Sequence, residues 1–326
     1  MSQAGLRRRI EEVTGRSPRG EVRVFTDTSG FMTISYGDVI RVGGRDFFVF
    51  GEASEGRFGL DEQPKHWVKR AWDLASGERK ILKLAFPESF TIDVGGVKVR
   101  CVRSPRKEAR ILEATSSDPH FMHGRTVEDD AGNLVRVLDR IEGESIYDRI
   151  QKMTISHDEY FRDELPRIFA SILGSVRAIA RLHEAGELHG DIRNDHLWIE
   201  RGSGTWRWID FDYAYEWTEN PFGIDLLGLG NILLFATGMG FVTARNLEEL
   251  LPPDRARALD LEPGDFSLFY PNRIMNLGKL YPCIPESLNR VLMRFAHKVE
   301  VLYTDTAELV ADLEACLEDL GVEEEP

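Results

Sequence analysis

Cysteine is scarce in this sequence. Cys101, Cys283 and Cys316 are the three cysteines among 326 residues, and they lie far apart. Their spacing matches neither a zinc-binding nor a redox motif. We therefore expect reduced, unpaired thiols and a cytosolic protein.

Long hydrophobic runs are also missing. The longest, residues 232–242, is broken by Gly238 and Gly240 and is too short to span a bilayer. No stretch near the N-terminus has the apolar centre of a secretory signal peptide. We expect a protein without a membrane span.

Positive charge is in deficit, since 41 Lys and Arg residues against 55 Asp and Glu residues give a formal net charge of −14. This balance argues against broad nucleic-acid binding, because the phosphate backbone selects basic surfaces. The basic residues that begin the chain predict a flexible, solvated segment over residues 1–20, with a short helix over residues 4–13 as the alternative.

One stretch, residues 188–213, carries two short acidic motifs. The first is HGD at residues 189–191, and the second is IDFD at residues 209–212. Between them, apolar and aromatic runs at residues 197–200 and 205–209 flank a Gly-Ser-Gly turn. This pattern is typical of a β-hairpin.

The hairpin would bring Asp191 and Asp210 toward one small volume, because the two ends of a hairpin meet. Two carboxylates in a cleft repel each other and lose hydration. A divalent cation that carries a polyphosphate would relieve both costs.

The order HGD-x4-H followed by IDFD resembles the catalytic and metal-binding loops of the protein-kinase-like phosphotransferases. The resemblance covers about residues 47–320. It implies an α+β, two-lobed protein-kinase-like fold with a β-rich N-lobe and a mostly helical C-lobe. It also implies ATP and Mg²⁺ or Mn²⁺ as cofactors, with Asp191 orienting or deprotonating an acceptor hydroxyl and Asp210 binding the metal.

Two further landmarks lie earlier in the chain. Lys83, in the apolar strand of residues 81–84, resembles the family's phosphate-contacting lysine, and the helix that Ser104 would cap carries Glu108, its ion-pair partner. The alternatives are a surface lysine on an edge strand and a glutamate that pairs locally.

The remaining nucleotide contacts are expected from backbone groups. Gly51, Gly56 and Gly59 would form a turn that covers the phosphates; the alternative is an ordinary hairpin turn without a binding role. Residues 134–141 resemble the interlobe hinge, where the backbone from Asp139 to Ile141 would meet the adenine ring.

The expected domain organisation follows from these landmarks. Residues 21–46 read as extra N-terminal β-strands, which are candidates for docking a protein partner or for dimerisation. Residues 91–102 read as a hairpin inserted into the N-lobe. The expected boundaries are 1–20 for the flexible basic N-terminus, 21–46 for the extra strands, 47–141 for the N-lobe and 142–326 for the C-lobe.

The chain departs from the family pattern at three positions. Gly190 replaces the arginine of H-R-D, so an arginine clamp on a phosphorylated activation loop is missing, as in aminoglycoside phosphotransferases. His196 replaces the metal-binding asparagine, and imidazole suits Mn²⁺ or later metals better than Mg²⁺. Asn194 or Asp195 would be substitutes. Asp212 replaces the glycine of D-F-G and resembles the second carboxylate in the IDFD of lipopolysaccharide Kdo kinases.

Three other residues have assigned roles with alternatives. Arg193 would reach the transferring phosphoryl group, or else lie on the surface. Asp225 would anchor backbone N–H groups of the catalytic loop, or else cap a helix. His189 is expected to be a packed structural histidine.

The resemblance implies an ATP-dependent phosphotransferase that moves the γ-phosphoryl group to a hydroxyl of a protein Ser/Thr or of a small molecule. One alternative is a pseudokinase scaffold or nucleotide-binding module, in which Gly190, His196 and Asp212 would mark decay. The other is nucleotidyl transfer (AMPylation) on the same fold.

Overall fold

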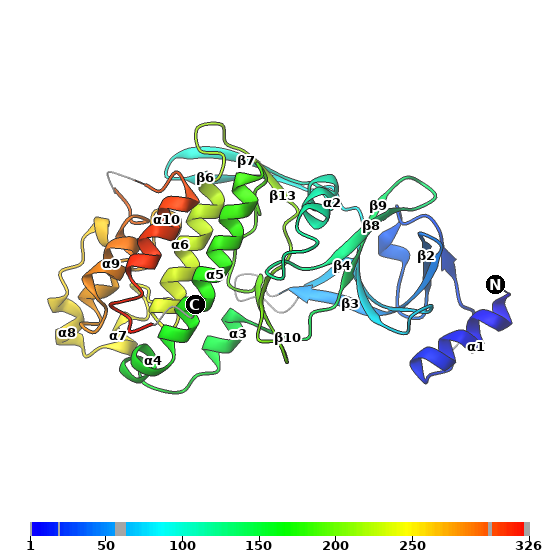
Figure 1. Cartoon of the computed structure of the whole chain (residues 1–326), viewed down its shortest axis with the longest axis horizontal. Helices are drawn as coiled ribbons and strands as arrows, with labels where there is room; N and C mark the ends of the chain where they lie inside the picture. The colour runs from blue at the N-terminus through cyan, green and yellow to red at the C-terminus, as the bar shows by residue number, and fades with distance from the viewer. Residues whose placement is uncertain (1, 19, 56–62, 299–301, 323–326) are drawn as a thin grey trace. The chain divides into compact units, whose positions relative to one another are not determined.

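The fold is a mixed α+β arrangement, seen in a computed structural model that describes residues 2–18, 20–55, 63–298 and 302–322 (Figure 1). The chain divides into two compact units. Unit 1 comprises Met1–Glu88, Arg103–Ser117 and Phe121–Glu142. Unit 2 comprises Ser89–Val102, Asp118–His120 and Gly143–Pro326.

Unit 1 is built on a seven-stranded mixed sheet of order β1-β2-β3-β4-β5-β9-β8. The β1–β2 pair is parallel and the other pairs are antiparallel. Residues 21–46 therefore extend the same sheet. Its elements are β1 (Val24–Phe25), η1 (Phe31–Thr33), β2 (Val39–Val42), β3 (Arg45–Glu55), β4 (Gln63–Asp73), β5 (Arg79–Lys83), β8 (Gly124–Glu128) and β9 (Leu134–Asp139).

Side chains alternate between the two faces of a strand, and β2 and β3 bury residues on both faces. Ile40 and Phe47 belong to one hydrophobic cluster, and their neighbours Val39 and Phe48 belong to another. The second cluster includes Leu6 and Ile10, two residues one helical turn apart.

These two residues come from helix α1 (Gln3–Thr14), so the predicted alternative of a short helix over residues 4–13 is confirmed and the flexible segment is wrong there. The side chain of Ser2 accepts a hydrogen bond from the Gly5 amide, which caps the helix start. Arg9 donates to the Leu74 and Ala75 carbonyl groups, which ties the helix to the end of β4.

Helix α2 (Pro105–Ala114) completes unit 1 and begins where the sequence predicts. The Ser104 hydroxyl accepts a hydrogen bond from the Lys107 amide, and Pro105 occupies the first helical position. The helix buries Glu108 together with Ile111 and Leu112, so a charged group lies in an otherwise apolar face.

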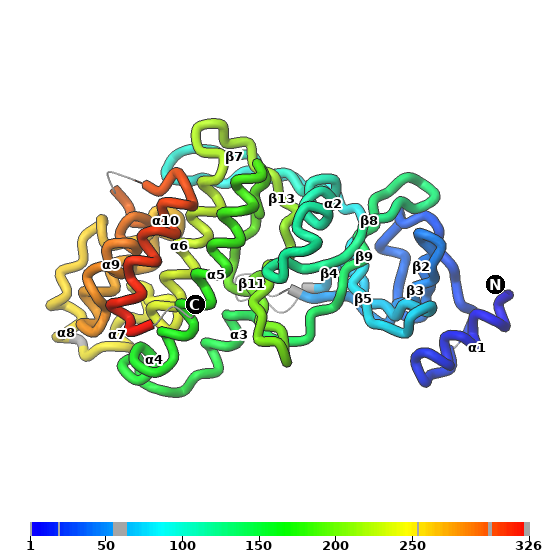
Figure 2. The backbone as a smooth tube through the Cα atoms, in the orientation of Figure 1, coloured from blue at the N-terminus to red at the C-terminus, as the bar shows by residue number. Residues whose placement is uncertain are grey.

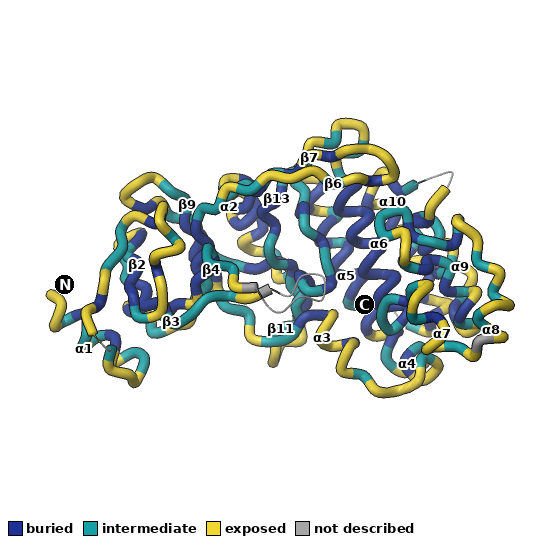
Figure 3. The backbone as a smooth tube through the Cα atoms, turned by 180° about the vertical axis from the view of Figure 1, so that it is seen from behind, coloured by how far each residue is buried: buried dark blue, intermediate teal, exposed yellow. Residues whose placement is uncertain are grey.

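Unit 2 is mostly helical. Helix α6 has every residue buried, as expected of a helix that is apolar on all sides, and appears dark blue in Figure 3. Helices α5, α6 and α10 lie side by side (Figure 2). The helices of unit 2 are α3 (Ile146–Gln151), α4 (His157–Asp163), α5 (Leu165–Glu184), α6 (Gly223–Thr237), α7 (Leu247–Leu250), α8 (Pro253–Ala258), η2 (Pro263–Asp265), η3 (Leu277–Lys279), α9 (Glu286–Met293) and α10 (Thr306–Ala315).

Two small sheets belong mainly to unit 2. One has the order β10-β11-β12 and carries the candidate site, and the other has the order β13-β7-β6. The predicted inserted hairpin is present as β6 and β7, but it groups with unit 2 because β7 pairs with β13. The strands are β6 (Ser89–Val94), β7 (Val97–Arg103), β10 (Gly143–Ser145), β11 (Leu197–Glu200), β12 (Trp206–Trp208) and β13 (Tyr213–Glu216).

Within the residues that the structure describes, none of the helices combines the length and the apolar character needed to cross a membrane. This agrees with the interrupted hydrophobic run seen in the sequence.

The Asp129 carboxylate fastens the N-terminal segment to the β8–β9 turn. It accepts hydrogen bonds from the amide and hydroxyl of Thr28, both at 2.7 Å, and from the Asn133 amide at 2.8 Å. Burial alone would raise the pKa of Asp129, but the bonds from Asn133 and Thr28 lower it to about 2.

We predict that Asp129→Asn lowers the free energy of unfolding by about 2 kcal/mol at pH 7. A carboxyl whose pKa is depressed on folding stabilises the fold above its unfolded pKa. That contribution should disappear as the pH falls from about 4 to about 2. Urea denaturation of both proteins across this range measures it, with the exposed Asp130→Asn as a control. A deficit that stays constant down to pH 2 would contradict the prediction.

Candidate functional site

The predicted hairpin of the acidic stretch is present in unit 2. Strands β11 and β12 pair antiparallel, with Leu197 opposite Trp208 and Ile199 opposite Trp206. Just beyond the paired strands, the Ile209 amide donates to the His196 carbonyl at 3.0 Å. This bond joins the two loops that carry the acidic motifs.

His196 lies between the two predicted carboxylates and is 3% exposed. Its Nδ1 is 3.4 Å from Asp191 Oδ2, and its Nε2 is 3.7 Å from Asp210 Oδ2. One imidazole thus spans both carboxyl groups. The prediction that Asp191 and Asp210 face one small volume is confirmed.

The contacts of His196 also determine which nitrogen carries the proton in the neutral ring. Nδ1 is 2.8 Å from the backbone carbonyl oxygen of Asp191, and a carbonyl oxygen only accepts hydrogen bonds. Nδ1 is therefore protonated, and the lone pair belongs to Nε2. That lone pair lies on the side of Asp210 and Asp195.

This donor set fits a divalent cation. Two ligands on one octahedral cation with bonds of about 2.1 Å are about 3 Å apart. The 3.7 Å between His196 Nε2 and Asp210 Oδ2 is within 1 Å of that value. An imidazole nitrogen beside carboxylate oxygens suits Mn²⁺ better than Mg²⁺. Asp212, fully buried two residues after Asp210, is the further carboxylate of this loop.

The pKa of the Asp191 carboxyl is raised. Burial is the main cause, His196 and Arg193 act against it, and the negative charges of Asp210 and Asp212 add to it. A raised pKa makes the Asp191 carboxylate a better proton acceptor than an ordinary aspartate at the surface.

Arg193 and Asp195 form an ion pair with each other. Arg193 Nε donates to one Asp195 oxygen at 3.0 Å, and Nη2 donates to the other at 2.5 Å. Burial acts to raise the pKa of Asp195, but His196 and Arg193 lower it overall. The prediction that Asn194 or Asp195 takes the place of the family's metal-binding asparagine stays a prediction. The Arg193 side chain pairs with Asp195, a residue of its own loop. Asn194 is buried, and its backbone carbonyl oxygen accepts a hydrogen bond from the Tyr147 backbone amide at 3.3 Å.

Asp225 holds the backbone that precedes Asp191. Its carboxylate accepts the His189 amide at 2.6 Å, the Gly190 amide at 2.7 Å and the His183 Nε2 at 2.9 Å. It is fully buried inside α6, whose N-cap is Phe222. The anchoring role expected for Asp225 is confirmed, and the helix-cap alternative is wrong.

Backbone conformation explains the missing arginine of the first motif. Gly190 has φ +84°, and a Cβ placed on it would lie 1.9 Å from the Tyr213 carbonyl oxygen. Neither an arginine nor any other side chain fits there. Asp210 also has a positive φ, 66°, which costs a non-glycine residue of order 1 kcal/mol and is commonest at functional sites.

His189 is fully buried, as predicted for a structural histidine. Its ring packs edge-on against Trp208 and Phe211, with centroid distances of 5.3 and 5.8 Å. Its Nδ1 accepts a hydrogen bond from the Asp191 amide at 3.2 Å, which adds a second constraint on the backbone of the loop that carries Asp191.

Unit 1 contains the Lys83–Glu108 ion pair that the resemblance implies, with Lys83 Nζ 2.7 Å from Glu108 Oε1. Sequence reasoning missed a second cation, since Arg136 Nε lies 2.9 Å from Glu108 Oε2. Lys83 and Arg136 are directly opposite each other on β5 and β9. In the sequence, the one sign of this second partner of Glu108 is the arginine at position 136 within the otherwise apolar run of residues 134–138.

The predicted nucleotide contacts from the backbone of unit 1 have mixed outcomes. Gly51 lies within β3, at an irregularity of the β3–β4 pairing, and not in a turn. Gly56 and Gly59 lie outside the described residues. The Asp139 backbone amide donates a hydrogen bond to the His123 carbonyl at 2.9 Å, so this N–H group already has an acceptor within the protein. Ile141 follows β9 and is half-buried.

Comparison with known proteins gives no relative. No protein-family model matches the chain, and no curated protein matches it significantly.

We predict that Gly190→Ala lowers the free energy of unfolding by at least about 2 kcal/mol, because both its φ and the Tyr213 carbonyl oppose a Cβ. Gly186→Ala is the matched control. Gly186 has φ +77° with nothing within 4 Å of a Cβ, so its replacement should cost only about 1 kcal/mol. Urea denaturation compares the two, and equal losses would contradict the role of the Tyr213 contact.

Proposed function

We propose that the protein is an ATP-dependent phosphotransferase of the protein-kinase-like type, with unit 1 as its β-rich lobe and unit 2 as its helical lobe. The observation that carries the proposal is His196, held between Asp191 and Asp210 with its Nε2 lone pair on the side of Asp210. The arrangement supports an adapted metal site, because a decayed site has no need to keep an imidazole in contact with both carboxylates.

Asp210 and His196 would hold Mn²⁺ or Mg²⁺, with Asp212 as the further carboxylate candidate. The cation would neutralise charge on the nucleotide phosphates. Within unit 1, the Lys83 ammonium group, which pairs with Glu108, is the candidate contact for nucleotide phosphates. The roles of these residues are positioning and charge neutralisation, which dominate phosphoryl transfer.

Asp191 would accept the hydrogen bond of the acceptor hydroxyl. As the hydroxyl oxygen bonds to the γ-phosphorus, the bond from that phosphorus to the β–γ bridging oxygen breaks, and ADP leaves with the electron pair. The hydroxyl proton passes to the Asp191 carboxylate, whose pKa is raised by burial. Asp225 and His189 keep the Asp191 backbone in place during this transfer.

Two observations favour a small-molecule hydroxyl over a Ser or Thr of an extended peptide. Gly190 leaves no arginine to hold a phosphorylated activation loop. The chain between Asp210 and Asp225 is short, and its strand β13 pairs with β7.

A calorimetric ATP titration of the full-length protein tests the proposal. We expect binding that requires Mn²⁺ or Mg²⁺, is lost with EDTA, and weakens at least about 10-fold in Asp210→Asn. Asparagine tolerates a positive φ, so this variant removes a charge without forcing the backbone to change. Asp191→Asn should keep ATP binding but lower the turnover of any acceptor about 1,000-fold.

The exposed Asp163→Asn is the control for loss of a surface charge. Absence of ATP binding under every condition would overturn the proposal. Binding that ignores the metal would indicate a nucleotide-sensing pseudokinase. Transfer of label from α-labelled ATP, but not from γ-labelled ATP, would indicate nucleotidyl transfer.

We further predict that His196→Asn shifts the metal preference toward Mg²⁺ by about 10-fold, because it replaces a nitrogen ligand with an amide oxygen. The asparagine amide can still donate to the Asp191 carbonyl, which preserves one contact of the loop. The ratio of ATP affinities in Mn²⁺ and Mg²⁺ measures the shift, and the exposed His297→Asn serves as the control. An unchanged ratio in a folded His196→Asn protein would contradict His196 as a metal ligand.

A further inference from the structure

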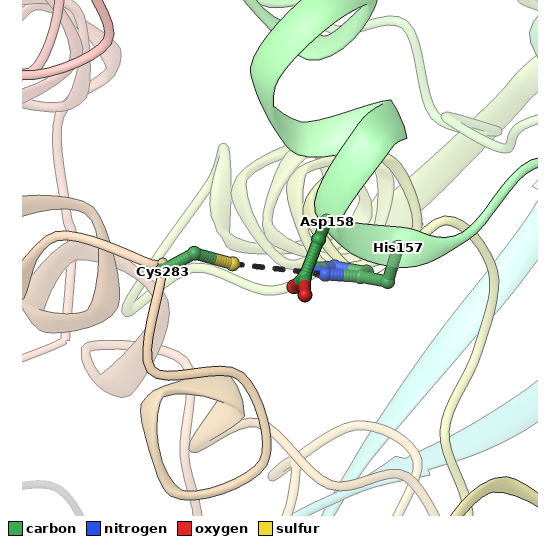
Figure 4. Close-up of side chains that lie close together, drawn as sticks. All are labelled: His157, Asp158 and Cys283. Carbon is green, nitrogen blue, oxygen red and sulfur yellow. Dashed lines mark hydrogen bonds between the residues drawn. The ribbon is translucent and has the colours of Figure 1, made fainter.

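A second group of possible metal ligands lies in unit 2 and is not used by the proposed reaction. It consists of His157 and Asp158, at the start of α4, and Cys283, in the loop before α9. Figure 4 shows the three side chains converging from these two segments. His157 Nδ1, Cys283 Sγ and an Asp158 carboxylate oxygen all lie within 4.8 Å of one another.

The imidazole of His157 is held in a defined position. Its ring stacks on Tyr281 with a centroid distance of 3.5 Å and an interplanar angle of 8°. Its Nε2 is 2.9 Å from the carbonyl oxygen of Thr237, which is the last residue of α6. These contacts fix the ring before any ligand arrives, as is usual for metal-binding histidines.

The bond to Thr237 also fixes the tautomer. A carbonyl oxygen only accepts, so Nε2 carries the proton and Nδ1 holds the lone pair. Nδ1 faces Cys283 Sγ at 3.8 Å. The nitrogen that can bind a metal is therefore the one that faces the thiol.

We propose that His157, Asp158 and Cys283 form a Zn²⁺ site in unit 2. With Zn–S of about 2.3 Å and Zn–N of about 2.05 Å, a tetrahedral ion separates its sulfur and nitrogen ligands by about 3.6 Å. The observed separation of 3.8 Å between Cys283 Sγ and His157 Nδ1 is close to this value. Asp158 is exposed, and its carboxylate lies within 4.8 Å of the other two ligand atoms, as the third member of the group.

The ligand types select the metal. A thiolate and an imidazole favour zinc over Mg²⁺ or Ca²⁺, which prefer oxygen ligands. Three protein ligands leave one tetrahedral position for water, as in open zinc sites. Zinc binding would replace the thiol proton of Cys283 and link α4 to the loop of residues 281–285, next to the end of α6.

The site is tested on the full-length protein after removal of bound metals with a chelator. We expect one equivalent of Zn²⁺ in a competition titration with a chromophoric chelator. Co²⁺ should give a thiolate-to-cobalt charge-transfer band and the intense visible bands of a tetrahedral ion. Cys283→Ser should lose the charge-transfer band and weaken Zn²⁺ binding about 100-fold or more, and Asp158→Asn should weaken it at least about 10-fold.

Two matched controls separate this site from incidental binding. Cys316→Ser removes a buried cysteine elsewhere in unit 2 and should keep the cobalt band. Asp163→Asn removes a second exposed carboxylate of α4 and should leave Zn²⁺ affinity unchanged.

A wild-type protein without the cobalt charge-transfer band would overturn the zinc site. Equal Zn²⁺ affinity in the wild type and Cys283→Ser would do the same. Cys283 is exposed, so its replacement by serine should not affect folding, and circular dichroism verifies this. The readouts are metal binding and spectra, so the result does not depend on the proposed phosphotransferase activity.

Discussion

The Asp225 carboxylate is the constraint on which the candidate site depends. It is fully buried, and it receives two consecutive backbone amides and an imidazole of another helix. Burying a carboxylate costs free energy unless its oxygens accept hydrogen bonds, and the two amides and the imidazole supply those bonds. The buried amides in turn need the carboxylate as their acceptor. Removing the carboxyl group would leave the His189 and Gly190 amides without their acceptor. The loop that presents Asp191 thus inherits its position from helix α6.

From this anchor, the geometry of the site follows in steps. With both amides directed at Asp225, Gly190 adopts a positive φ and passes close to the Tyr213 carbonyl. The chain then turns so that the Asp191 carbonyl meets His196. The β11–β12 hairpin returns the chain to Asp210, whose strained backbone directs its carboxylate to the other side of the same imidazole. Each contact joins atoms that are close in space, and together the contacts connect the chain segment before the hairpin with the segment after it.

The hairpin and the proximity of Asp191 and Asp210 could be predicted from sequence because hairpin geometry is local. The anchor role of Asp225 was available only as one of two alternatives, since a helix cap has the same sequence signature. Arg136 was missed because its partner Glu108 is 28 residues away and comes from another element. The N-terminal helix could be predicted only as an alternative to a flexible segment, since Leu6 and Ile10 become informative only when the sheet that covers them is known.

Two of the three departures from the pattern that the sequence resembles, Gly190 and His196, have a physical explanation in this structure. The backbone requires a glycine at position 190, so the absence of an arginine there is not by itself a sign of lost function. His196 keeps the spacing of the residue it replaces, and its tautomer leaves a lone pair beside Asp210. One loop system thus combines an aspartate with a positive φ, an imidazole in a fixed orientation and a buried carboxylate that anchors two amides. Under the proposed function, this combination favours an active metal site over a pseudokinase scaffold.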